Sequence, residues 1–258
     1  MGKICPLFSG SKGNCTFISA DGEGVLIDAG VSCKKILEAL GEIAIQKNSI
    51  KAIFITHEHS DHIAGLKVLL KTLTVPVYCS EKTAKALNHI YPEINAVGFE
   101  NEIKICGMKI RRFNTSHDCD GSSGYRVFLP DGSSAAVCTD TGVLSNEILN
   151  TLSGSDAVLI ESNHCVTMLQ KGPYPPELKQ RILSDKGHLS NTDCACAALK
   201  LYESGTRRFV LAHLSENNNL PSLALSTTQA VFMDKGLKKD TDYILYIAKP
   251  SQNEITYF

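Results

Sequence analysis

The sequence has almost no net charge and no long apolar run. It carries 26 Lys and Arg against 27 Asp and Glu, so its formal net charge is −1. A strongly basic surface draws a protein to nucleic acid or to acidic membranes, and this balance excludes such a global field. Any contact with DNA or RNA must then come from a local patch. No apolar stretch approaches the roughly 20 residues of a membrane span, so no membrane segment is expected.

The sequence also lacks any Cys-x-x-Cys pair, although it contains ten cysteines at irregular spacing. Cys79, Cys106 and Cys138 fall within predicted strands, where cysteine acts as a small hydrophobic residue. The first residues, Met1–Pro6, lack the apolar core and cleavage site of a signal peptide. These features predict reduced thiols and a cytoplasmic protein.

Linkers, repeats and low-complexity segments are absent as well. A chain of 258 residues can form one large α/β domain or two small ones. Its 43% hydrophobic and 21% charged residues are ordinary for a globular protein. We therefore expect a single domain spanning residues 1–258.

The most informative stretch is 52–73, AIFITHEHSDHIAGLKVLLKTL, in which a buried strand precedes a helical pattern. His57 and His59 lie in extended backbone, where alternate side chains point the same way. Asp61 and His62 follow as the chain turns into the helix, so they can face a second point nearby. This arrangement suits two adjacent metal ions, whereas one zinc site on a helix would space its histidines at i and i+4. The alternative is a solvated, histidine-rich loop.

Other predicted strands end in residues of the same kinds. Asp28, His117, Asp140, Glu161 and His213 each stand at or just after an apolar run. Ligands gather at the carboxyl ends of strands in open sheets, so these positions are candidates for the same site. Asp28 is expected to orient a metal-bound histidine, or alternatively to cap the helix that follows.

His-x-His-x-Asp-His after a buried strand resembles the signature of the metallo-β-lactamase-fold hydrolases, and the other strand ends match the remaining family motifs in order. The resemblance implies an α/β fold, a four-layer αββα sandwich of two mixed sheets flanked by helices. It implies one metal on His57, His59 and His117, another on Asp61, His62 and His213, and a bridging Asp140. This set of nitrogen and oxygen ligands suits two divalent ions. Zn²⁺ is the preferred ion, and Mn²⁺ or Fe can also bind such a set.

A bridging aspartate without a cysteine resembles the phosphodiesterase, nuclease and thioesterase branches of the family. Two metal ions can activate a hydroxide and clamp phosphoryl oxygens, with Asp61 among the catalytic residues, but they supply no proton to the leaving group. Gly187–Asn191 resembles the His-Ser/Thr element of transfer-RNA 3′-processing enzymes. We therefore expect His188 to be the general acid or a phosphate contact, with Glu161 setting its tautomer. Alternatively, His188 only neighbours a helix cap.

Four further residues are candidates for substrate contacts. Ser190 and Asn191 begin a predicted helix, whose N–H groups can seat a phosphate. His164 and Asn217 are either substrate-binding or plain polar loop and cap residues. Another candidate is the glycine loop around Lys12 and Asn14, which is either a phosphate cradle or an ordinary turn.

Four segments resemble the YycJ/WalJ group of this family: residues 10–15, 161–164, 187–191 and 212–219. The resemblance implies a metal-dependent phosphodiesterase with 5′→3′ exonuclease action on DNA, so its expected partner is nucleic acid or a nucleotide phosphodiester. Three alternatives stay open: a small-nucleotide or cyclic phosphodiesterase, a glyoxalase-like thioester hydrolase, and a metal-bound regulator without turnover. The oligomeric state is left open.

Overall fold

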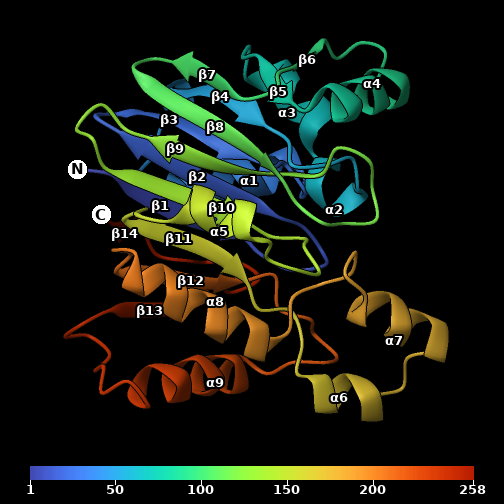
Figure 1. Ribbon diagram of the computed structural model, residues 1–258. Helices are drawn as coiled ribbons and strands as arrows, with labels where there is room; N and C mark the ends of the chain where they lie inside the picture. Colours follow the sequence, from blue (N-terminus) through green and yellow to red (C-terminus); the bar gives the residue numbers. More distant parts are fainter.

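The computed structural model describes residues 1–258 and contains two seven-stranded mixed sheets (Figure 1). In the first sheet, β3 to β6 run parallel and β14, β1, β2 and β3 pair antiparallel. Its strands, in sheet order, are β14 (Thr256–Tyr257), β1 (Lys3–Phe8), β2 (Cys15–Ala20), β3 (Glu23–Ile27), β4 (Ile50–Phe54), β5 (Val77–Cys79) and β6 (Ala96–Gly98).

In the second sheet, β10 to β13 run parallel and β7 to β10 pair antiparallel. Its strands, in sheet order, are β13 (Ile244–Ile247), β12 (Arg208–Ala212), β11 (Ala157–Glu161), β10 (Ser134–Cys138), β9 (Ser123–Phe128), β8 (Met108–Asn114) and β7 (Glu102–Ile105). Both sheets are therefore mixed, as expected.

Helices cover the outer face of each sheet. Apolar residues of α1, α3 and α4 join the core on the first sheet, and those of α5, α8 and α9 join the core on the second. The helices are α1 (Cys33–Glu42), α2 (Ser60–Ile63), α3 (Leu66–Thr72), α4 (Glu81–Ile90), α5 (Asn146–Leu152), α6 (Val166–Lys171), α7 (Pro176–Leu183), α8 (Asn191–Glu203) and α9 (Pro221–Met233), with a 3₁₀ turn at Lys47–Ser49.

A third core cluster fills the space between the sheets. Phe54 and Tyr125 meet there with ring centroids 5.4 Å apart, and neither ring is exposed to solvent. On β4, Ala52 and Phe54 face this inner core while Ile53 faces the helix side. A strand buried on both faces reads as a continuous apolar run, as this one does in the sequence. The layers are thus helix, sheet, sheet and helix, which confirms the expected αββα sandwich.

The helical pattern in the second half of residues 52–73 forms two helices. α2 ends at Ile63 and α3 begins at Leu66, with Gly65 between them. A Cβ atom on Gly65 would lie 1.9 Å from the backbone oxygen of Val31. The chain therefore bends where it packs against the β3–α1 connection, a contact that the apolar spacing does not reveal.

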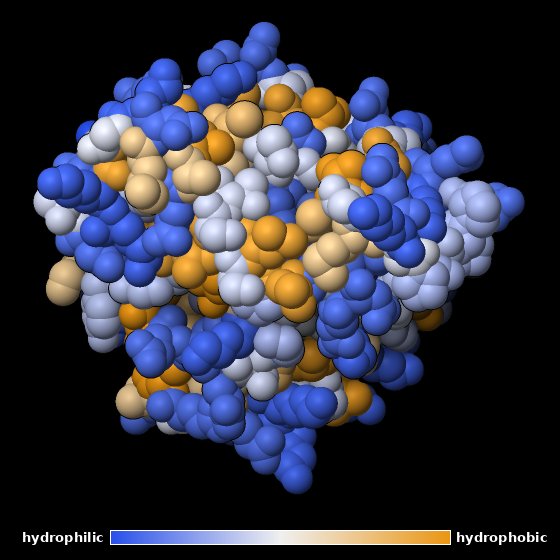
Figure 2. Space-filling model, turned by 90° about the horizontal axis from the view of Figure 1, so that it is seen from below, coloured by the Kyte–Doolittle hydropathy of each residue, from blue (hydrophilic) through white to orange (hydrophobic).

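All ten cysteines are free thiols in this structure. None of its helices has the length and apolar character required to cross a bilayer. Figure 2 shows the molecule from below, the side on which α6 and α9 lie in Figure 1; apolar residues gather near its middle among hydrophilic ones. Leu220 and Met233, at the two ends of α9, are exposed.

Candidate metal centre

The predicted ligands converge where several strands end. His57 lies three residues after β4, His117 three residues after β8, and Asp140 two residues after β10. His213 directly follows β12. Asp140 and His213 have positive φ values of 55° and 54°, so the chain turns sharply as it leaves each strand. Such left-handed backbone is uncommon outside glycine and clusters at functional sites.

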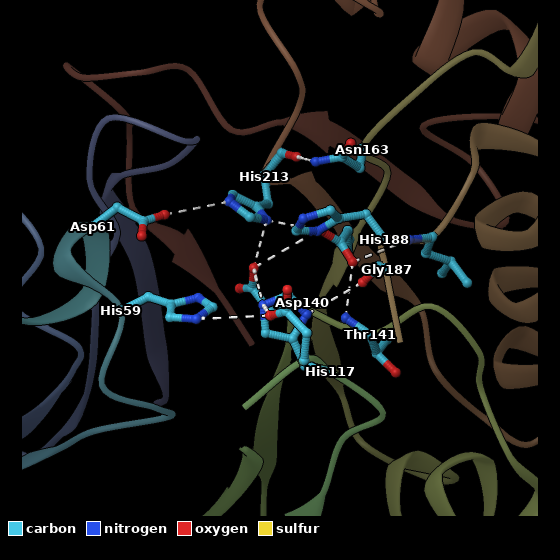
Figure 3. A network of polar contacts seen from close by, with 12 residues as sticks. His59, Asp61, His117, Asp140, Thr141, Asn163, Gly187, His188 and His213 are labelled. Carbon is cyan, nitrogen blue, oxygen red and sulfur yellow. Dashed lines mark hydrogen bonds and ion pairs between the residues drawn. The ribbon is translucent and has the colours of Figure 1, made fainter. Parts of the chain in front are cut away.

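Two sets of three side chains present ligand atoms that lie within 4.8 Å of one another: His57, His59 and His117, and Asp61, His62 and His213. Asp140 lies between the sets (Figure 3). Its Oδ2 is 3.4 Å from His62 Nε2, and its Oδ1 is 3.9 Å from His117 Nε2. The structure thus brings together all seven predicted ligands. The first and the last of them, His57 and His213, are 156 positions apart in the sequence.

Hydrogen bonds on the far side of two rings set their orientation. Asp28 Oδ2 lies 2.7 Å from His62 Nδ1, and Thr56 Oγ1 lies 3.0 Å from His57 Nδ1. Asp28 also accepts the Thr56 backbone N–H at 2.8 Å, which ties both partners together. With Nδ1 occupied, each ring turns Nε2 toward the centre, as outer partners of metal-bound histidines do. Asp28 therefore occupies the orienting position expected of it.

The centre leaves buried polar atoms without partners. His57 Nε2, His213 Nε2 and Asp140 Oδ2 are all inaccessible and form no hydrogen bond. A buried donor or acceptor without a partner destabilises a fold by about 1–3 kcal/mol. Divalent cations would give these atoms their missing partners, and imidazole with carboxylate is a donor set that Zn²⁺, Mn²⁺ and Fe accept. The residues present therefore fit metal ions.

Burial and neighbouring charges set the protonation of the predicted ligands. Burial and the neighbouring imidazoles of His62, His117 and His59 lower the pKa of His57, which keeps it in the neutral form that binds metals. Burial alone would lower the pKa of His62, but Asp28 and Asp140 raise it to about 10. In the absence of ions, the His62 ring is therefore doubly protonated near neutral pH, and its positive charge partly offsets the negative charge of the local carboxylates.

Metal loading is therefore expected to release protons. At pH 7, which is below the raised pKa values of His62 and His213, adding Zn²⁺ to the metal-free protein should liberate about one to two protons per chain. The release can be measured with a pH indicator in weak buffer, with KCl as the matched control. Zinc binding without proton release would contradict a protonated His62.

Glu161 connects this centre to His188. Its Oε1 lies 2.8 Å from both His188 Nδ1 and His213 Nδ1, and its Oε2 accepts the backbone N–H groups of Thr141 and Leu189. Burial would raise the pKa of Glu161, but His188 and His213 hold it well below its usual value. Burial likewise opposes protonation of His188, and Glu161 raises its pKa nonetheless. An ionised carboxylate thus orients two imidazoles.

The centre opens into a cavity of about 270 Å³. Among the residues that line it are His59, His117, His188 and His213, together with several that were not predicted as site residues: Ser11, Asp118, Asn163, Tyr174, Leu178, Arg181 and Ile182. Some of the missed residues carried a usable signal: Ser11 and Asn163 lie in segments that resemble the family group, and Thr56 and Asp118 directly adjoin a ligand histidine. A second cavity, of about 360 Å³, lies beside residues 9–13 and contains none of the predicted ligands.

None of the four residues expected to contact substrate lines the metal cavity, and three of them are buried. Ser190 Oγ caps α8 by accepting the Asp193 N–H at 3.1 Å. Asn191 is buried, with its amide bonded to Ser162 and Asn219. His164 is only 1% exposed, too deep to contact a macromolecule. These side chains pack into or cap the fold because α8 docks on the second sheet.

Asn217 and the glycine loop bond to residues next to the cavity and to the metal centre. Asn217 Nδ2 donates to the Tyr174 hydroxyl at 2.9 Å, so it supports a residue of the cavity instead of lining it. Lys12 pairs with Glu216 at 2.6 Å, and Asn14 Nδ2 lies 3.1 Å from His62 Nε2. The loop thus packs against the metal centre and forms no free phosphate cradle.

Gly30 holds the loop that carries Asp61 and His62. A Cβ atom there would lie 1.7 Å from the backbone oxygen of Asp61. Gly30→Ala should therefore lower the free energy of unfolding by about 1–3 kcal/mol and weaken metal binding. Gly41→Ala is the matched control, because its Cβ meets nothing within 4 Å and alanine favours helix α1. Thermal unfolding of the two variants tests this, and equal melting temperatures would contradict it.

Comparison with known proteins agrees with this geometry. Residues 24–214 match the model of the beta-lactamase superfamily domain. The chain therefore belongs to the beta-lactamase superfamily and is a metal-dependent hydrolase with the metallo-β-lactamase fold.

Two curated relatives share most of the chain. It is 37% identical over 235 residues to exodeoxyribonuclease YycJ of Bacillus anthracis, covering 89% of each protein. It is 38% identical over 255 residues to exodeoxyribonuclease WalJ of Streptococcus pneumoniae, covering 96% of this chain and 94% of the relative. The metallo-β-lactamase-fold protein YhfI of Bacillus subtilis superposes over 100% of both chains with a TM-score of 0.72 at 14% identity, which reflects the shared fold.

Proposed function

We propose that the protein is a dinuclear metal-dependent phosphodiesterase that degrades DNA as a 5′→3′ exonuclease. The observation that carries the proposal is the position of Asp140, whose carboxylate lies between two sets of ligands and 3.7 Å from His188. The two exodeoxyribonucleases that are similar over about nine-tenths of each chain support DNA as the substrate. Ten free thiols support a reducing compartment, the cytoplasm.

The residues divide into two metal sites. His57, His59 and His117 would hold one ion, Asp61, His62 and His213 would hold the other, and Asp140, which lies beside both sets, would be shared by the two ions. A pair of ions, with Zn²⁺ as the first choice, supplies Lewis acidity toward phosphoryl oxygens and lowers the pKa of bound water. Asp28 and Thr56 keep two of the ligand rings in place through their Nδ1 atoms.

The chain itself must supply the proton that the leaving oxygen takes. His188 lines the cavity, and its Nδ1 lies 2.8 Å from an ionised Glu161. This contact keeps the proton on Nδ1 of the neutral ring and stabilises the doubly protonated form, in which Nε2 can donate. Glu161 contacts His213 in the same way, so one buried carboxylate aligns the acid with a metal ligand.

Removal of the ions is expected to abolish phosphodiester cleavage and to lower the melting temperature, since a ligand that binds only the folded state stabilises it. Dialysis against a chelator, followed by reloading with Zn²⁺, Mn²⁺ or Fe²⁺, tests this and identifies the active metal. Metal analysis should find two ions per active chain. Full activity with a single ion would contradict the dinuclear site.

A substrate comparison separates the candidate activities. DNA labelled at the 5′ or the 3′ end, RNA, cyclic nucleotides and S-lactoylglutathione are offered to the same loaded enzyme. Release of nucleotides in order from the 5′ end of DNA is the expected result. Cleavage of cyclic nucleotides alone would establish the small-nucleotide alternative, and cleavage of the thioester alone would establish the glyoxalase-like one.

A further inference from the structure

The segment between α6 and α8 forms one wall of the metal cavity. Tyr174, Leu178, Arg181 and Ile182 line the cavity, although α7 has no fully buried residue. In Figure 1, α6 and α7 project to one side, beyond the strands and away from α8 and α9. This segment therefore adds little to the core, and its inner side chains face the site.

Arg181 is the one Arg or Lys among the residues that line this cavity. Its guanidinium Nε donates to Asp118 Oδ2 at 2.5 Å, and its Nη2 contacts the same oxygen. The other oxygen of Asp118 lies 3.3 Å from His117 Nε2 and 3.7 Å from His59 Nε2. A single carboxylate thus separates the guanidinium from two predicted metal ligands.

Asp118 orients Arg181 without using all of its donors. A guanidinium has five N–H groups, and the two contacts with Asp118 leave about three of them available. The Arg181 side chain is 55% exposed, so these donors are open to solvent and to a ligand. Guanidinium is the preferred group for phosphate, which it can bind through two parallel hydrogen bonds.

A nucleic-acid substrate brings further phosphates beside the one that is cleaved. Because the net charge of the chain is −1, no general basic field attracts these phosphates, and a local cation is required. Arg181 lies one carboxylate, Asp118, away from the metal centre, so its free donors face the same cavity as the predicted ligands.

Tyr174 adds an aromatic surface beside this cation. Prolines precede and follow it, at Pro173 and Pro175, which restricts the backbone on both sides. Its hydroxyl accepts a hydrogen bond from Asn217, so the half-buried ring has a defined place on the cavity wall. Bases stack on such rings in proteins that bind single strands.

We infer that Arg181 and Tyr174 form a subsite for the nucleotide adjacent to the cleaved phosphodiester, with Arg181 on its phosphate and Tyr174 on its base. The inference rests on the proposed function. The metal centre would bind only the phosphate that is cleaved, and the subsite would bind the next nucleotide of the strand. It assigns specificity for a nucleic-acid strand over a single phosphodiester to the wall formed by residues 174–181.

The Arg181→Gln variant tests the phosphate contact. It should raise the KM for single-stranded DNA about tenfold or more, and it should reduce the slope of log KM against log salt concentration by about one. The increase for bis(p-nitrophenyl) phosphate should be several-fold smaller, since that substrate has no second phosphate. Lys179→Gln is the matched control on the same helix, because Lys179 bonds to the Gln170 carbonyl and does not line the cavity.

The Tyr174 variants test the stacking surface. Tyr174→Leu should raise the KM for DNA by about five- to a hundredfold, whereas Tyr174→Phe, which keeps the ring, should restore most of the affinity. Equal KM values and salt slopes for wild type, Arg181→Gln and Lys179→Gln would overturn the subsite. If the loaded enzyme instead cleaved cyclic nucleotides and no DNA, the proposed function itself would fail, which is a separate result.

Discussion

Replacing Asp140 with alanine is expected to lower phosphodiester turnover by on the order of 10³-fold or more. The variant should also bind fewer than two ions per chain. Asp140 lies beside both ligand sets, with Oδ2 3.4 Å from His62 Nε2 in one set and Oδ1 3.9 Å from His117 Nε2 in the other. Its loss removes a ligand from both sites and leaves the imidazoles to repel one another when protonated. Turnover and metal content, measured on the same preparation, check the result.

Asp120→Ala is the matched control for this experiment. Asp120 lies three residues from His117, its side chain is 91% exposed, and it pairs only with Lys82 at 3.5 Å. The same substitution at this surface position should leave both metal content and turnover unchanged. An Asp140→Ala protein that kept two ions and full turnover would show that Asp140 does not bridge the metals.

The second large effect is expected at His188. His188→Ala should reduce cleavage of DNA by about 10²–10⁴-fold while metal content stays the same, because this side chain is the proposed proton donor and not a ligand. The reduction should be much smaller for bis(p-nitrophenyl) phosphate, whose nitrophenolate leaves without a proton. The ratio of the two losses therefore separates proton donation from general damage to the site.

His89→Ala provides the comparison for His188. His89 lies in the last turn of α4, is exposed, and belongs to no group of candidate ligands. Equal losses on DNA and on the nitrophenyl ester for His188→Ala would assign His188 a binding role only. Loss of metal from that variant would show that it supports the metal centre through Glu161, which also contacts His213.

Glu161 illustrates how closely the two parts of the site are coupled. Its Oε1 is 2.8 Å from His188 Nδ1 and equally far from His213 Nδ1, so one oxygen atom orients the proposed acid and a predicted ligand. Any substitution at Glu161 must affect both, and effects at such residues are not additive. Variants at His188 are for this reason the cleaner test of proton transfer.

The fold could be predicted largely from local patterns. The continuous apolar run of β4 and the strand-end residues Asp28, Asp140 and His213 follow one another in the order of the family motifs, and the structure has the expected two mixed sheets. The division of the helix at Gly65 could not be predicted, because its cause is a contact with Val31, 34 positions earlier in the chain.

The residues on the substrate side of the site could not be predicted from local patterns. Ser190, Asn191 and His164 carry polar groups in promising segments, but the docking of α8 turns them into the protein. Arg181 lies in a helix without a motif, and nothing in its neighbours along the chain distinguishes it from Lys179. Its place beside Asp118 comes from the path of the segment between α6 and α8.

The sequence by itself therefore predicted the candidate metal ligands and the architecture, because residue type, strand periodicity and the order of strand ends match the family motifs. Only the tertiary structure decided which other side chains share the cavity. Long-range packing sets the direction of each side chain, and Asp118 with Arg181, 63 positions apart, or Asp28 with His62, 34 apart, meet only when the sheets and their helices have assembled.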